Sequence, residues 1–192
     1  NEILISLIFI INGLILYSSE YLYLQNNIIS LCIFSFLVYI IAIIDIQNLL
    51  IPNKIIKIGI FLALINGIII SILNNDYYYL LDRLFSGLLG FLFLEIIIFV
   101  LFLITNKYAF GSGDSKFYGL VGFWLGFNNL VTTFVLSIYL GGIFCLIGIL
   151  LNKLNRKDKI PFAPFISVSA YLVALLTSAN VWDLFSRLYI SP

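Results

Sequence analysis

Two aspartates, Asp45 and Asp114, are the side chains whose type and setting in this sequence suggest chemistry. Asp45 closes an apolar run, and Asp114 stands in a glycine-rich string at the start of another. Two carboxyls held close together cannot both ionise cheaply, so they share one proton. One then acts as a base on water while the other acts as an acid on the scissile carbonyl of a peptide. The pair therefore predicts aspartyl proteolysis, provided that the fold brings the two side chains together.

Each aspartate also has a structural explanation. Asp45 precedes a helix break at Pro52 and Asn53, which is compatible with a helix-end carboxylate that reaches headgroup water. Asp114 belongs to the residue types preferred at a helix N-cap, where the side chain accepts hydrogen bonds from the first free amides of the helix. Neither explanation excludes catalysis, and both stay open.

The glycines around Asp114 are not needed for a cap. Gly111 and Gly113 flank Ser112, so the backbone beside the carboxylate carries few side-chain atoms and can adopt conformations that other residues avoid. A bare backbone suits an extended peptide that docks along it. We therefore expect Gly111, Ser112 and Gly113 to bind substrate.

Other chemistries have little support. The sequence contains no His and two Cys, and both Cys32 and Cys145 stand inside apolar runs, where free Cys commonly packs as a small apolar residue. Zinc chemistry is thus close to excluded. General acid and base catalysis by two carboxyls needs no metal or organic cofactor, so we expect neither.

Composition places the chain in the membrane. It is 62% hydrophobic and 10% charged, with a mean hydropathy of +1.15, far from the balance of a soluble domain. A net charge of +1 and the lack of a basic stripe give no basis for nucleic-acid binding. We expect a single membrane-embedded domain over residues 1–192, in contact with lipid.

Apolar runs separated by short polar clusters predict an all-α bundle of about seven transmembrane helices, since a hydrocarbon core about 30 Å thick needs about 20 apolar residues per crossing. The expected fifth span is short for a full crossing, which leaves three interpretations open: it is tilted, it is shielded by its neighbours, or it is continuous with its flanking turn. The expected spans are residues 3–18, 28–46, 55–73, 84–104, 115–127, 130–151 and 162–180.

Basic residues predict the orientation, because cytoplasmic loops collect Lys and Arg. Simple alternation puts the loops after the second, fourth and sixth spans on one side, which makes that side cytoplasmic and places both aspartates at its edge. The residues that carry this bias are Lys54, Lys57, Lys107, Lys116, Lys153, Arg156, Lys157 and Lys159.

A third acid, Glu95, lies within the fourth expected span, on a helix that also carries Gly87 and Gly90. Small residues of this kind let another helix approach closely. Two interpretations stay open for Glu95: a neutral or hydrogen-bonded packing residue, or a residue that tunes the site.

Three strings occur in order along the chain: IIDIQNLLIPNK, GSGDSKFYGLVGFWLG and IPFAPFISVSA. Together they resemble the bacterial type IV prepilin peptidases, intramembrane aspartyl proteases with a Gly-x-Gly-Asp motif. The first resembles the family's Asp followed by Pro. The second resembles its Gly-x-Gly-Asp-x-Lys signature with a downstream Trp-Leu-Gly, here Trp124 to Gly126. The third resembles its Pro-Phe-Gly-Pro-Phe segment, with Ala163 in place of the usual Gly.

The resemblance implies that Asp45 and Asp114 are the catalytic pair. It further implies cleavage of a short basic leader ahead of the hydrophobic helix of prepilin or pseudopilin precursors, on the cytoplasmic side. Lys116 matches the family's Lys and is either a loop lysine or a cation that favours an ionised carboxylate. The remaining candidates for the substrate cleft are Pro161, Phe162 and Pro164, although the two prolines also suit a helix start.

Longer members of that family carry paired Cys-x-x-Cys motifs and methylate the new N-terminus. This sequence has only Cys32 and Cys145, so we expect a short form with peptidase activity and no methyl transfer. Presenilin-type proteases share the Gly-x-Gly-Asp motif, but their Pro-Ala-Leu string does not occur here. A transporter with acidic relay groups or a structural subunit of a secretion apparatus are the alternatives from other classes.

Overall fold

The computed structural model describes residues 25–106, 111–153 and 160–178. Within these ranges the chain forms only helices, so the predicted all-α class is confirmed for them. The helices are α2 (Gln25–Asn48), α3 (Asn53–Asn74), α4 (Tyr77–Thr105), α5 (Ser112–Leu125), α6 (Phe127–Leu150) and α7 (Ala163–Ser178).

Four of these helices, α2, α3, α4 and α6, are long and apolar enough to cross a membrane. The chain is therefore a multi-pass membrane protein. Helices α5 and α7 are shorter, with 14 and 16 residues. The first expected span, residues 3–18, lies outside the described residues, so the count of seven spans stays a prediction.

Helix α4 begins at Tyr77, before the apolar run that predicted a start at residue 84. The Asp76 side chain caps the helix by accepting a hydrogen bond from the Tyr78 N–H at 3.0 Å. The helix therefore includes the charged pair Asp82 and Arg83. The Arg83 guanidinium donates to the carbonyl of Trp124. The predicted start at residue 84 was wrong because the helix begins before the apolar run and includes charged residues.

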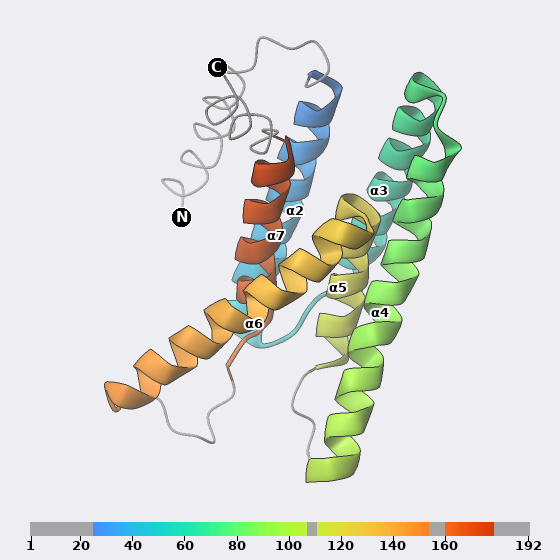
Figure 1. Cartoon of the computed structure of the whole chain (residues 1–192). Coiled ribbons are helices and arrows are strands. Elements are labelled where there is room, and N and C mark those ends of the chain that lie inside the picture. Colours follow the sequence, from blue (N-terminus) through green and yellow to red (C-terminus); the bar gives the residue numbers. More distant parts are fainter. Residues whose placement is uncertain (1–24, 107–110, 154–159, 179–192) are drawn as a thin grey trace, which may run out of the picture.

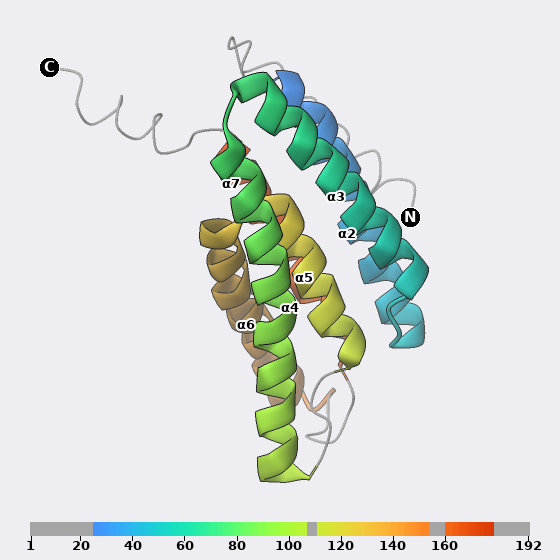
Figure 2. The same cartoon turned by 90° about the vertical axis from the view of Figure 1, so that its right-hand side faces the viewer.

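The short helix α5 is the centre of the bundle. It contacts α3, α4, α6 and α7, and ten of its fourteen residues are buried. Figures 1 and 2 show it enclosed between α3 and α4, with α6 crossing beside it. Of the interpretations left open for this short helix, shielding by its neighbours is the one that the burial of α5 supports.

Glycines allow the close packing of α5 on α4. A Cβ atom added to Gly122 would lie 2.7 Å from the carbonyl carbon of Ser86 and 3.0 Å from the Cα of Gly87, both backbone atoms. A Cβ on Gly119 would lie 3.1 Å from the Gly87 carbonyl oxygen. Small residues let helix backbones approach in this way inside membranes.

The ends of the helices gather the residues singled out from the sequence. The C-terminal ends of α2, α4 and α6 and the N-terminal ends of α3, α5 and α7 lie toward the lower side of Figure 1. Asp45, near the end of α2, and Asp114, at the start of α5, both belong to this side. The alternation assumed in the sequence therefore holds for the described helices.

Candidate active site

Asp45 lies in the last turn of α2 and is held by the start of α7. Its side chain is only 5% exposed, and its carboxylate accepts a hydrogen bond at 3.1 Å from the backbone N–H of Ala163. The Ser167 hydroxyl also donates to the carbonyl of Val38 at 2.9 Å, which joins the same two helices. Two parts of the chain far apart in sequence are thus held together at Asp45.

Asp114 is the third residue of α5 and is 8% exposed. Its carboxylate accepts a hydrogen bond from the backbone N–H of Gly111 at 3.1 Å, and Gly111 itself occupies the N-cap. The predicted N-cap position of Asp114 is therefore wrong by one turn, because the side chain reaches back from N3, as acidic residues at that position do. The capping interaction uses one hydrogen bond, so the Asp114 carboxylate can also serve other roles.

The two carboxylates interact electrostatically. Burial of Asp114 raises the pKa of its carboxyl to about 6, and the negative charge of Asp45 contributes to the same rise. The hydrogen bond from Gly111 acts in the opposite direction. An acid near a second carboxylate holds its proton to higher pH because two like charges repel each other.

This coupling gives a direct prediction. Asp45→Asn removes the charge that faces Asp114, so the pKa of the Asp114 carboxyl should fall from about 6 toward the ordinary value of about 3.9 without reaching it, since burial remains. The titration of ¹³C-labelled carboxyl carbons by NMR would measure the change. Asp76→Asn is the matched control, because Asp76 is exposed at the opposite side of the bundle. An unchanged Asp114 titration in Asp45→Asn would contradict the coupling.

The loop after α2 packs against the glycine-rich string. A Cβ atom on Gly113 would lie 3.0 Å from the Cβ of Ile51, so the bare backbone at Gly113 accommodates Ile51. The Lys116 ammonium donates to the side-chain oxygen of Asn53 at 3.0 Å. The Gly111–Lys116 segment is thus joined to the segment that follows Asp45.

Gly111 and Ser112 are exposed beside the buried Asp114. This leaves the start of α5 open on the side where these two residues lie. Of the three residues expected to offer bare backbone to a substrate, Gly113 is half-buried under Ile51 and the other two are accessible.

The third string forms the start of α7. Pro164 is the second residue of the helix, where Pro is well tolerated, and the carbonyl of Phe162 accepts the Phe165 N–H at 3.0 Å. A Cβ on Gly141 of α6 would lie 3.6 Å from the Phe162 ring, so that ring is directed at α6. Pro161 is half-buried. These residues adjoin Asp45 through Ala163.

Three partners in the site were not predicted. Ala163 supplies the N–H that holds Asp45, Asn53 accepts from Lys116, and Ile51 covers Gly113. All three lie inside the sequence strings that resemble the family's motifs. This position was the sequence signal that could have assigned them to the site. Their roles depend on backbone atoms or on contacts between helices, neither of which a residue type reveals.

Glu95 is separate from the aspartate pair. It lies ten residues before the end of α4, about 15 Å along the helix axis. One of its carboxylate oxygens is buried and has no hydrogen-bond partner among the described residues. Cys32 and Cys145 are half-buried free thiols.

Fold and site together define a class: a multi-pass membrane protein with two buried carboxyls at one side of the bundle, where three chain segments meet. Residues 31–146 match the Type IV leader peptidase family, and the chain belongs to this family. Both aspartates lie within the matched residues.

Two proteins that are similar to this chain share one name. A prepilin leader peptidase/N-methyltransferase of Bacillus subtilis is 34% identical over 144 residues, which cover 74% of this chain and 54% of the relative. The protein of the same name in Aeromonas salmonicida is 30% identical over 149 residues, 77% of this chain and 47% of the relative. The chain thus spans about half the length of these curated relatives. No solved structure shows a significant match to the chain.

Proposed function

We propose that this chain is a membrane aspartyl endopeptidase that removes the short basic leader from prepilin or pseudopilin precursors at the cytoplasmic face. The observation that carries the proposal is the burial of two carboxyls, Asp45 and Asp114, at the same side of the bundle. The charge of Asp45 also contributes to the raised pKa of Asp114. Family membership and the names of the relatives support the same activity. The proposal is confined to peptide cleavage.

In the proposed mechanism Asp45 and Asp114 share one proton. The ionised carboxyl takes a proton from water, which attacks the scissile carbonyl, and the protonated carboxyl donates to the carbonyl oxygen. Hydrogen bonds from Ala163 and Gly111 orient the two carboxylates. Because these donors are backbone N–H groups of helix starts, the orientation does not depend on mobile side chains.

The substrate is proposed to pass over the starts of α5 and α7. Gly111 and Ser112 are exposed next to Asp114, which fits an extended peptide. Gly113, Lys116, Pro161, Phe162 and Pro164 complete the proposed substrate-binding set. The cytoplasmic position rests on the lysines at this side of the bundle, since basic residues collect in cytoplasmic loops.

The test is cleavage of a co-expressed pilin-like precursor, followed as a shift on a gel. The intact chain should convert the precursor, and Asp114→Asn should leave it uncut although the protein still inserts in the membrane. Asp76→Asn is the matched control, because Asn caps a helix about as well as Asp and Asp76 serves as a cap. A precursor that stays uncut with the intact chain, or is cut equally by Asp114→Asn, would overturn the proposal.

A further inference from the structure

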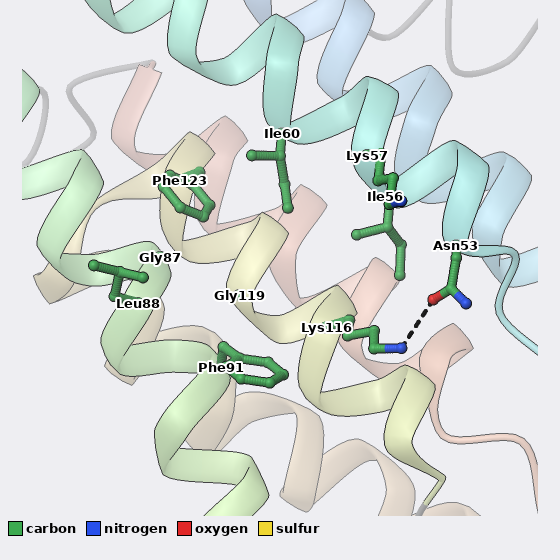
Figure 3. A pocket seen from close by; sticks show the side chains of 10 residues that line it. All are labelled: Asn53, Ile56, Lys57, Ile60, Gly87, Leu88, Phe91, Lys116, Gly119 and Phe123. Carbon is green, nitrogen blue, oxygen red and sulfur yellow. Dashed lines mark hydrogen bonds between the residues drawn. The ribbon is translucent and has the colours of Figure 1, made fainter.

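A cavity of about 460 Å³ lies between α3, α4 and α5, beside the starts of α3 and α5. Figure 3 shows Asn53, Lys57 and Lys116 along one side and the side chains of α4, together with Phe123, along the other. The proposed mechanism places no step in this cavity. Of its lining residues, only Lys116 also belongs to the proposed substrate-binding set.

The polar side carries two cations. Lys57 is exposed, and Lys116 donates to the Asn53 side chain. Neither ammonium has a carboxylate within ion-pair distance in the described part of the chain. An ammonium group has three donors, so Lys116 keeps hydrogen-bonding capacity after its bond to Asn53. Among the described residues, the two lysines therefore leave a positive charge without a counter-ion at one side of a cavity whose other lining residues, apart from Asn53, are apolar.

The opposite side is apolar. Leu88 and Phe91 of α4 and Phe123 of α5 line it, and Leu88 is 60% exposed on the outside of the bundle. Gly119 lies at the floor of the cavity. The cavity thus combines a cationic rim with an apolar surface that continues onto the lipid-facing side of α4.

We infer that this cavity binds an anionic phospholipid, with the headgroup phosphate between Lys57 and Lys116 and an acyl chain along Leu88, Phe91 and Phe123. Basic pockets between transmembrane helices bind anionic headgroups in this way. The volume corresponds to about one turn of a helix about 10 Å wide, too little for a transmembrane segment of a substrate.

Native mass spectrometry of the purified chain would test the site with phosphatidylglycerol and phosphatidylcholine of the same acyl chains. Phosphatidylglycerol should bind more tightly, and Lys57→Gln or Lys116→Gln should each weaken it about fivefold, the change expected for one lysine near a headgroup. Lys54→Gln is the matched control, because Lys54 is exposed on the same helix and does not line the cavity. Leu88→Trp, which narrows the apolar side, should weaken both lipids.

Three results would overturn the inference. The first is equal binding of the two lipids, and the second is an equal effect of Lys54→Gln and Lys57→Gln. The third is full binding of glycerophosphoglycerol, the headgroup without its chains, which would indicate a site for a free anion. Circular dichroism of each variant confirms folding. None of these measurements depends on peptidase activity, so the lipid site and the proposed function succeed or fail separately.

Discussion

Asp45→Asn and Asp114→Asn are each expected to reduce precursor cleavage by about 10³-fold or more, and the double variant is expected to be no slower than either single variant. Catalytic groups that act as a unit lose most of their effect when one member is removed. General acid and base catalysis alone contributes about 10²-fold to 10⁴-fold. Burial and the charge of Asp45 both raise the pKa of the Asp114 carboxyl. In the proposed mechanism the two carboxyls share one proton, so the loss of either carboxyl removes this shared state.

The double-mutant cycle would be measured from initial cleavage rates of a synthetic precursor peptide. The assay uses detergent and equal amounts of the intact chain and of each variant. Asp76→Asn should keep the rate of the intact chain. If the losses of the two single variants instead multiply in the double variant, the aspartates act independently and the shared-proton mechanism fails. A near-normal rate in one single variant would make that aspartate structural.

Gly122→Ala is expected to destabilise the fold by about 1 to 3 kcal/mol, the range found when extra carbon is forced into a packed interior. The new Cβ would lie 2.7 Å from the Ser86 carbonyl carbon, and these backbone atoms cannot turn aside as a side chain would. The loss should exceed the gain of up to about 1 kcal/mol that Ala brings to a helix. Thermal unfolding in detergent, followed by circular dichroism, would show a lower midpoint.

Gly142→Ala provides the comparison within the same chain. A Cβ at Gly142 meets nothing within 4 Å, so this variant should keep or raise the unfolding midpoint. The two substitutions add the same methyl group to a helix and differ only in what surrounds it. If Gly122→Ala unfolds at the same midpoint as Gly142→Ala, the close approach of α4 and α5 is not required for stability.

Much of the helical architecture could be predicted from local composition. A backbone in lipid must satisfy its hydrogen bonds internally, so apolar runs of membrane length predict helices, and α2, α3 and α6 lie close to the expected ranges. The start of α4 could not be located, because Asp82 and Arg83 interrupt the apolar run without interrupting the helix. The carbonyl that accepts from Arg83 belongs to Trp124, on another helix.

For the candidate site, too, one part could be predicted from the sequence and another part depends on the tertiary structure. Residue type singles out three acids, Asp45, Asp114 and Glu95, because a carboxylate at membrane depth is costly and requires a reason. The setting of Asp45 and Asp114 in the sequence then favours these two as the pair. Only the tertiary structure decides that Ala163 holds Asp45, that Ile51 covers Gly113 and that the two carboxyls interact. The physical reason is that every residue except proline carries the same backbone N–H group. The residue type therefore does not reveal which N–H group will donate to a given carboxylate. Distances between helices depend on how the helices pack at small residues. Local sequence shows the small residues but does not show which helix packs against them.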